Sequence, residues 1–209
     1  MPKPIEDLEI IAAELRPHFV AEDEAREKAL RSCRQAIRCS ADAIRAVHRQ
    51  EEDKAGQLLA SAHELLRELN HDLAEHGRLL YAGFVHDAQK EFAEGYITLA
   101  LIAGEDLPKP QALGVSNAAY LDGLGESVGE LRRYILDSLR REDFSRCEEL
   151  LSIMDEIYGM LMTMDFPELL AHGLRRTTDA MRGIIERTRG DLTISLRQRR
   201  LEAKLNDLS

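Results

Sequence analysis

The chain has 209 residues, 44% of them hydrophobic, which is enough to bury one substantial core. Its 28 basic and 38 acidic residues give a formal net charge of −10, so a nucleic acid would have to be met by a local basic surface rather than by overall attraction. The N-terminal segment has no long apolar run with a small-residue cleavage site, and no segment approaches about eighteen consecutive apolar residues. We therefore expect neither export nor a membrane span.

Three cysteines, Cys33, Cys39 and Cys147, occur without a CxxC pair. Their neighbours are helical in pattern rather than the glycine- and proline-rich loops of a disulfide scaffold. We expect reduced thiols and a cytoplasmic protein.

Helical periodicity runs through most of the chain. The six prolines are predicted to lie where it starts or stops, because a residue without an N–H group is tolerated there. The segment at residues 53–75 is the clearest, since its leucines recur at three- and four-residue steps, and no segment indicates a strand. The pattern predicts seven helices, near residues 5–15, 21–50, 53–75, 78–103, 117–141, 144–163 and 167–205.

The longest irregular stretch, residues 104–117, holds two prolines. It ends at Ser116 and Asn117, either of which can cap the following helix. We expect a crossover loop inside one domain.

A basic helix is predicted within this acidic chain, since residues 26–49 contain seven basic side chains and two acidic ones. At about 100° per residue, five of the arginines fall within roughly 60° of one another. Guanidinium groups at successive turns can follow a phosphate backbone without identifying bases. A solvated face, or pairing with acids on a neighbouring helix, explains the same run and is the commoner role of such charges. The basic ridge consists of Arg31, Arg34, Arg38, Arg45 and Arg49.

Acidic side chains recur at helical spacing in two segments. Glu91 and Glu94 lie three residues apart, and Glu126 and Glu130 lie four apart. If the pairs face each other, four carboxylates form an all-oxygen site for Mg²⁺ or Mn²⁺, which can activate water and neutralise charge on a phosphodiester. Such pairs are also common on exposed helices, so the spacing alone leaves the metal site a hypothesis.

The second acidic segment also contains Gly123, Gly125 and Gly129. Each glycine inside a helix costs about 1 kcal/mol relative to alanine. Close packing of another backbone would offset that cost, so we expect a neighbouring helix to approach here.

Familiar catalytic motifs are missing from the sequence, including the Walker, GxGxxG, GxSxG and HExxH patterns. One ExxH, from Glu68 to His71, falls short of the two that a di-iron bundle needs. His48, His86 and His172 are expected at the surface or the core edge rather than as metal ligands.

Taken in order, four segments resemble the translin family, which comprises translin and translin-associated factor X, over about residues 23–192. They are REKALRSCRQAIRCSADAIRAVHR, QKEFAEGY, YLDGLGESVGELRR and DFSRCEELLSIMDEIYGMLMTMDF. The likeness is closer to the catalytic factor-X type, whose glutamates three apart match Glu91 and Glu94 and whose acidic pair before Leu-x-Arg matches Glu126 and Glu130. The family usually has aspartate where this chain has Glu126, one methylene longer.

The resemblance implies an all-α, seven-helix antiparallel bundle of translin type, a single domain over residues 1–209 with residues 1–20 and 206–209 peripheral or frayed. It implies a hollow homo-oligomer, commonly an octamer, that binds short single-stranded or duplex RNA, or single-stranded DNA, on its inner wall. It also implies a Mg²⁺-dependent endoribonuclease, with Mn²⁺ as the other candidate ion. The four glutamates would be the catalytic and metal-binding residues, and the basic ridge would hold the RNA.

Two alternatives stay open at this point. One is a non-catalytic RNA- or single-stranded-DNA-binding protein of the same architecture, in which Glu126 has cost the activity. The other is a structural helical bundle without nucleic acid.

Overall fold

The computed structural model describes residues 4–166 and 173–206, which form helices and their connections without a strand. Two short helices, α3 (Gly77–Leu80) and α5 (Pro110–Leu113), lie in the connections. No described helix combines the length and apolar character needed to cross a membrane. The prediction of an all-α fold is confirmed. The main helices are α1 (Pro4–His48), α2 (Glu52–Asp72), α4 (Gly83–Ala103), α6 (Asn117–Arg140), α7 (Cys147–Met162) and α9 (Leu174–Asn206).

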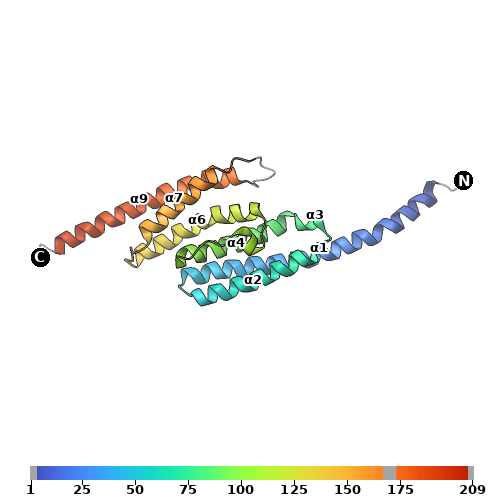
Figure 1. Cartoon of the computed structure of the whole chain (residues 1–209), viewed down its shortest axis with the longest axis horizontal. Coiled ribbons are helices and arrows are strands. Elements are labelled where there is room, and N and C mark those ends of the chain that lie inside the picture. Colours follow the sequence, from blue (N-terminus) through green and yellow to red (C-terminus); the bar gives the residue numbers. More distant parts are fainter. Residues whose placement is uncertain (1–3, 167–172, 207–209) are drawn as a thin grey trace.

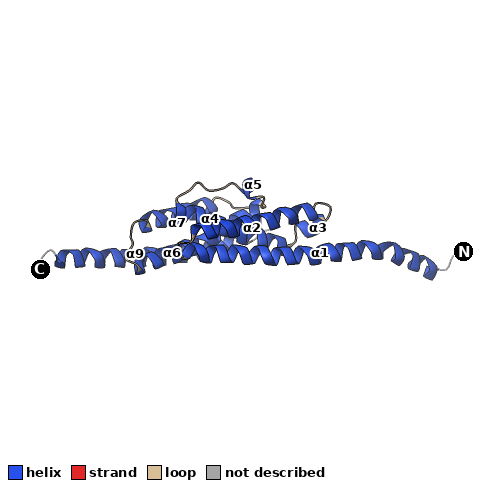
Figure 2. Ribbon diagram, turned by 90° about the horizontal axis from the view of Figure 1, so that it is seen from below, coloured by secondary structure: helices blue, strands red, loops and turns tan. Residues whose placement is uncertain are grey.

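The first two predicted helices are one helix, α1, which is 45 residues long and contains Pro17. The prediction that Pro17 ends a helix is wrong. Proline removes one backbone hydrogen bond, but α1 is fully exposed around Pro17, so water can satisfy the carbonyl that is left without a partner. Figure 2 shows α1 as a continuous helix that bends towards its N-terminus.

Other boundaries also differ from the prediction. A turn after Leu80 separates α3 from α4, and the predicted loop at residues 104–117 contains α5. The last helix continues through Asn206, close to the predicted end at residue 205, whereas residues 207–209 and the predicted helix start at 167–172 lie outside the described residues. Ser116 caps α6 as predicted, because its hydroxyl accepts a hydrogen bond from the Ala119 amide at 3.2 Å.

Figure 1 shows that α1, α4, α6 and α9 run in the same direction, while α2 and α7 run back. The pairs His86–Asp122 and Lys90–Glu126 both join residues 36 apart, as contacts between parallel helices do. The predicted antiparallel arrangement therefore holds for α1 with α2 and for α6 with α7, whereas α4 and α6 run parallel. The long connection between α4 and α6 returns the chain to the start of α4, where the Ser116 amide donates to the Gln89 side chain at 3.0 Å.

The central helices α4 and α6 pack closely through glycine. A Cβ atom on Gly123 would lie 2.8 Å from both the Glu94 amide nitrogen and the Lys90 carbonyl oxygen, and one on Gly125 would lie 2.5 Å from Thr177 Cγ2. Nothing lies within 4 Å of a Cβ on Gly129, and the contacts at Gly125 are with side chains of α7 and α9, so the predicted approach of another backbone holds for Gly123 alone. This approach brings side chains of α4 and α6 together.

Candidate functional site

Three of the four predicted glutamates converge where α4 and α6 meet. Glu91 and Glu94 on α4 and Glu126 on α6 each offer a carboxylate oxygen within 4.8 Å of the others. Glu91 and Glu126 are half-buried, and Glu94 is buried. We call these three residues the carboxylate cluster.

Glu94 is the innermost member of the cluster. It is 8% exposed, and it makes no hydrogen bond or ion pair with the part of the chain that the structure describes. Burial first, and then the charges of the Glu126, Glu91 and Glu130 carboxylates, together raise the pKa of Glu94 to about 8, against a smaller lowering by Lys90. At neutral pH the Glu94 carboxyl is therefore mostly protonated.

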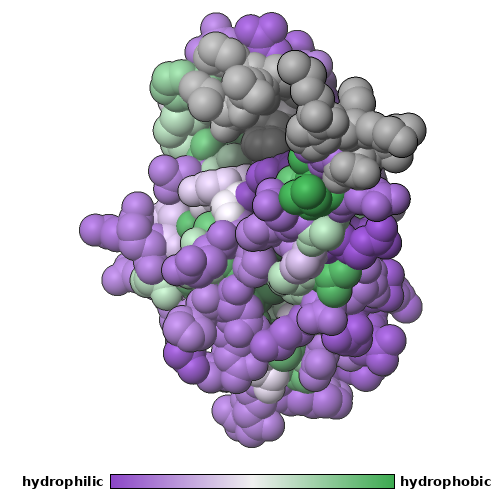
Figure 3. All heavy atoms as spheres, turned by 90° about the vertical axis from the view of Figure 1, so that its right-hand side faces the viewer, coloured by the Kyte–Doolittle hydropathy of each residue, from purple (hydrophilic) through white to green (hydrophobic). Residues whose placement is uncertain are grey.

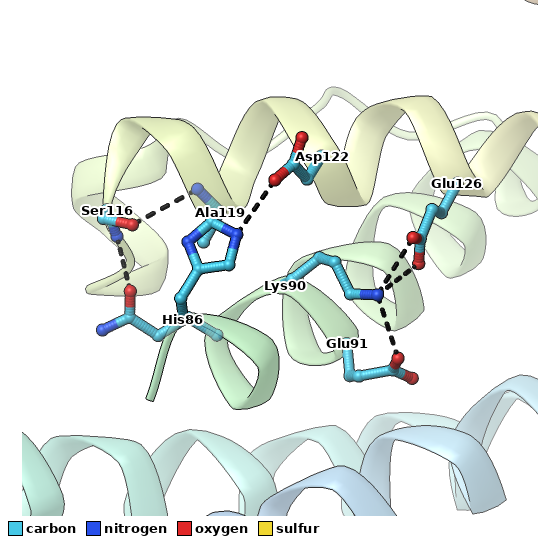
Figure 4. Close-up of polar contacts among 8 residues, drawn as sticks. His86, Lys90, Glu91, Ser116, Ala119, Asp122 and Glu126 are labelled. Carbon is cyan, nitrogen blue, oxygen red and sulfur yellow. Dashed lines mark hydrogen bonds and ion pairs between the residues drawn. The ribbon is translucent and has the colours of Figure 1, made fainter. Parts of the chain in front are cut away.

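Lys90 lies between Glu91 and Glu126 of the carboxylate cluster, as Figure 4 shows. Its Nζ atom donates to Glu126 at 2.8 Å and lies 3.3 Å from Glu91. Burial by itself lowers the pKa of Lys90, but the hydrogen bond and charge of Glu126, with those of Glu91, outweigh burial and raise that pKa. The ammonium group is thus an internal cation for the cluster.

The side chain of the fourth predicted residue, Glu130, contacts α1 rather than α4. His48, at the end of α1, contacts the Glu130 carboxylate through Nε2 at 2.5 Å. The Arg133 guanidinium lies 3.8 Å from the same carboxylate. The hydrogen bond from His48 lowers the pKa of Glu130 despite partial burial. Glu130 is near enough to act on the charge of Glu94, but its side chain is oriented by α1, so its role as a ligand stays a prediction.

A second polar pair lies one helical turn away from the cluster. His86 Nε2 lies 2.9 Å from Asp122 Oδ2, and Asp122 is 6% exposed. The other oxygen, Asp122 Oδ1, is buried and has no hydrogen-bond partner among the described atoms. His48 and His86 both contact carboxylates at partly buried positions, which fits the expected core edge, whereas His172 lies outside the described residues.

Lys90 and Asp122 are not among the predicted site residues, although the sequence contains a signal for both. Lys90 precedes Glu94 by four residues, and Asp122 precedes Glu126 by four. Residues four apart share one helix face, so each had to point towards the same groove as its acidic partner. What periodicity does not show is which faces of α4 and α6 meet.

A cavity of about 750 Å³ opens beside the cluster between α4, α6 and the start of α9. Lys90, Glu94 and Glu126 line one part of it, and Arg176 of α9 lines another. The volume is within the range of small-molecule sites. The charges lining the cavity suit a cation together with a phosphodiester group.

The residues present fit a divalent ion, with three changes. Oxygen ligands around Mg²⁺ lie about 2.9 Å apart when adjacent and about 4.2 Å apart when opposite, so the three oxygens need only small rotamer shifts. In addition, Lys90 has to withdraw from the cluster and Glu94 has to lose its proton. Binding of the ion would thus displace the Lys90 ammonium group and the Glu94 proton from the cluster.

All five arginines of the basic ridge are exposed on α1. Arg45 pairs with Asp42 at 2.5 Å, and the other four make no ion pair within the described residues. Because His48 contacts Glu130, the end of α1 that carries Arg45 and Arg49 lies near the acidic helix α6. The ridge extends from there over about 27 Å of helix.

Comparison with known proteins gives several related chains, although no family model matches the sequence. An uncharacterized protein of Methanocaldococcus jannaschii is 28% identical over 190 residues, which cover 90% of this chain and 84% of that protein. The structure of apo-NeC3PO superposes with a TM-score of 0.79 at 16% identity, covering 93% of this chain and 98% of the other, a likeness of fold alone.

AfC3PO is more similar in sequence. The structure of its complex with duplex RNA superposes with a TM-score of 0.82 at 34% identity, covering 90% of this chain and 97% of AfC3PO. The crystal structure of AfC3PO gives the same TM-score at 33% identity. With this identity over nearly its whole length, the chain belongs to the translin family, as a homologue of C3PO.

Proposed function

We propose that this protein binds RNA and cleaves it as a Mg²⁺- or Mn²⁺-dependent endoribonuclease, with Glu91, Glu94 and Glu126 holding the ion. The observation that carries the proposal is the convergence of these three carboxylates beside a cavity. The AfC3PO complex supports the choice of substrate, because that relative of the same fold binds duplex RNA. Glu130, fixed by His48, completes the predicted acidic set from the next turn of α6.

The bound ion would supply positive charge to the phosphodiester and an activated water. The protein's own groups prepare the site. Glu94 would lose its proton to solvent when an ion binds, because its pKa of about 8 lies close to neutral pH. His48 orients Glu130, and the arginines of the ridge hold the RNA backbone without selecting bases.

We further propose that the chain works as a hollow homo-oligomer, an octamer by its resemblance to the family, in the cytoplasm. All three cysteines are free thiols, two of them buried, which suits a reducing compartment. In such a shell the acidic residues would face outward and the ridge inward, so that RNA meets positive charge in a protein of net charge −10.

Substitution of the acidic residues tests the cleavage. Glu126→Gln and Glu130→Gln each remove one negative charge at nearly constant shape, so we expect both to abolish cleavage of labelled RNA in Mg²⁺. Helicity and mass in solution should be unchanged, and Glu68→Gln, on the exposed face of α2, should cleave normally. Cleavage at the wild-type rate by both variants, or full activity in EDTA, would exclude the proposed metal site.

The salt dependence of RNA affinity tests whether the basic ridge binds RNA. Replacing Arg34, Arg38 and Arg45 together by alanine should weaken binding similarly for unrelated RNA sequences. The plot of log affinity against log salt should flatten by about two to three units, since each neutralised phosphate contributes roughly 0.7 for single strands and 0.9 for B-form DNA. An unchanged slope in a variant that keeps its mass would place RNA on other helices.

One observation favours a second candidate, an RNA-binding protein without cleavage. Lys90 already neutralises part of the cluster, so the carboxylates are stabilised without an ion. Labelled RNA that is bound but stays intact in both Mg²⁺ and Mn²⁺ would select this alternative.

A further inference from the structure

The two ends of the chain form helical extensions that project from opposite ends of the bundle (Figures 1 and 2). In α1 the first buried residue is Ala29, so we call residues 4–24 the N-terminal arm. In α9 the last buried residue is Leu192, and we call residues 193–206 the C-terminal arm. Among the side chains that the structure describes, neither arm contributes a fully buried residue. The start of the C-terminal arm still contacts its own bundle, since Leu196 packs against the core and Arg199 lies over the Phe144 ring at 4.8 Å, so its free part begins after Arg199.

The N-terminal arm exposes a row of large hydrophobic side chains. Leu8, Ile11, Leu15 and Phe19 recur at three- and four-residue steps, which places them on one side of the helix, and each is 49% to 64% exposed. Figure 3, which faces this end of the molecule, shows hydrophobic groups between hydrophilic ones. Contiguous exposed apolar surface of this kind marks an interaction site.

The C-terminal arm carries a smaller apolar row and the opposite charge. Ile194 and Leu201 lie two turns apart on one side of α9 and are 58% and 59% exposed. Residues 197–206 contain four basic side chains and one acidic one, whereas residues 7–24 of the N-terminal arm contain six acidic and one basic. Each arm thus combines an apolar row with a charge that the other arm complements.

The charges lie beside the apolar rows. At about 100° per residue, Asp7 and Glu14 lie along one edge of the row in the N-terminal arm. Arg200 and Lys204 lie along the corresponding edge in the C-terminal arm. Flanking charges of opposite sign set partner choice when two amphipathic helices pack through such rows.

We propose that the N-terminal arm of one chain packs against the C-terminal arm of a second copy, and that this contact builds the homo-oligomer of the proposed function. The two arms of one chain cannot meet, because they project in opposite directions (Figure 1). Two N-terminal arms repel each other, and an acidic helix is repelled by nucleic acid and by anionic membrane surfaces. The basic C-terminal arm of another copy would cover the apolar row and neutralise the acidic charge of the N-terminal arm.

Each copy carries one arm of each kind, so repeated arm contacts can join copies into a closed oligomer. In a two-fold dimer, both arm contacts form between the same two chains. In a ring, each chain contacts one neighbour through its N-terminal arm and the other neighbour through its C-terminal arm. Partner contact also stabilises the arms themselves, because an isolated helix of about 14 to 21 residues is marginal in water.

Charge reversal tests the contact. Asp7→Lys/Glu14→Lys makes the N-terminal arm basic, and Arg200→Glu/Lys204→Glu makes the C-terminal arm acidic. Like charges then face each other in each variant, so the concentration needed for association, measured by sedimentation or light scattering, should rise on the order of a hundredfold. An equimolar mixture of the two variants should associate again, because each supplies the arm that complements the other.

The matched control is Glu68→Lys/Glu156→Lys, which makes an equal charge change at exposed positions of α2 and α7 and should associate like wild type. Circular dichroism checks that every variant stays helical. A monomeric wild type, normal association of both arm variants, or a mixture of helical variants that stays monomeric would each overturn the proposal. Mass is measured without RNA or metal, so assembly through other surfaces overturns the arm contact and leaves the proposed nuclease activity intact.

Discussion

Glu94→Gln is expected to stabilise the metal-free protein at alkaline pH and to leave its stability at acidic pH nearly unchanged. The folded state holds the Glu94 proton with a pKa of about 8, against a usual value of 4.5. Between these two values the unfolded chain has lost a proton that the folded chain keeps. The free energy of unfolding therefore falls as pH rises through this window.

The size of this effect follows from the pKa. Raising the value from 4.5 to about 8 corresponds to a cost of about 5 kcal/mol once the carboxyl is fully ionised. A glutamine of the same shape carries no charge and avoids that cost. For a chain of this size we expect the variant to melt on the order of 10 °C above wild type at pH 9.

Urea unfolding followed by circular dichroism in EDTA, from pH 4.5 to pH 9, measures the effect. The stability difference between wild type and Glu94→Gln should grow through this range, while Glu68→Gln, at an exposed position, should show no such trend. Adding Mg²⁺ or Mn²⁺ at pH 9 should stabilise wild type and not the Glu94 variant. A wild-type minus variant difference that is independent of pH would refute the argument that burial and neighbouring carboxylates hold this proton.

Three further substitutions test the role of Lys90 and the packing around the cluster. Lys90→Gln removes the ammonium that an ion has to displace, so we expect Mn²⁺ to bind at least about tenfold more tightly in titration calorimetry, and an unchanged affinity would show that Lys90 does not compete with the ion. Gly123→Ala places a Cβ 2.8 Å from backbone atoms of α4 and should destabilise the fold by about 1–3 kcal/mol, whereas Gly129→Ala, which meets nothing within 4 Å, should stabilise it by up to about 1 kcal/mol. Equal effects of the two alanines on urea unfolding would contradict the close approach of α4 and α6.

The sequence by itself determined the helical class, because apolar residues at three- and four-residue steps suit only a helix that packs along one face. It also placed Glu91 with Glu94 on one helix face and Glu126 with Glu130 on another through spacing alone. The exposure of the five ridge arginines followed from the same wheel. These are local properties, fixed by the geometry of one helix.

Other features depend on contacts between distant segments, and only the tertiary structure decided them. Whether Pro17 ends a helix depends on the solvent around it, and the parallel course of α4 and α6 depends on where the α5 connection docks. The charge state of Glu94 and the position of Lys90 follow from burial and from partners on another helix. Glu130 is likewise held by His48, 82 residues earlier in the chain. Periodicity shows which residues share a face, whereas packing decides which faces meet, and both pKa values and ion pairs depend on that meeting.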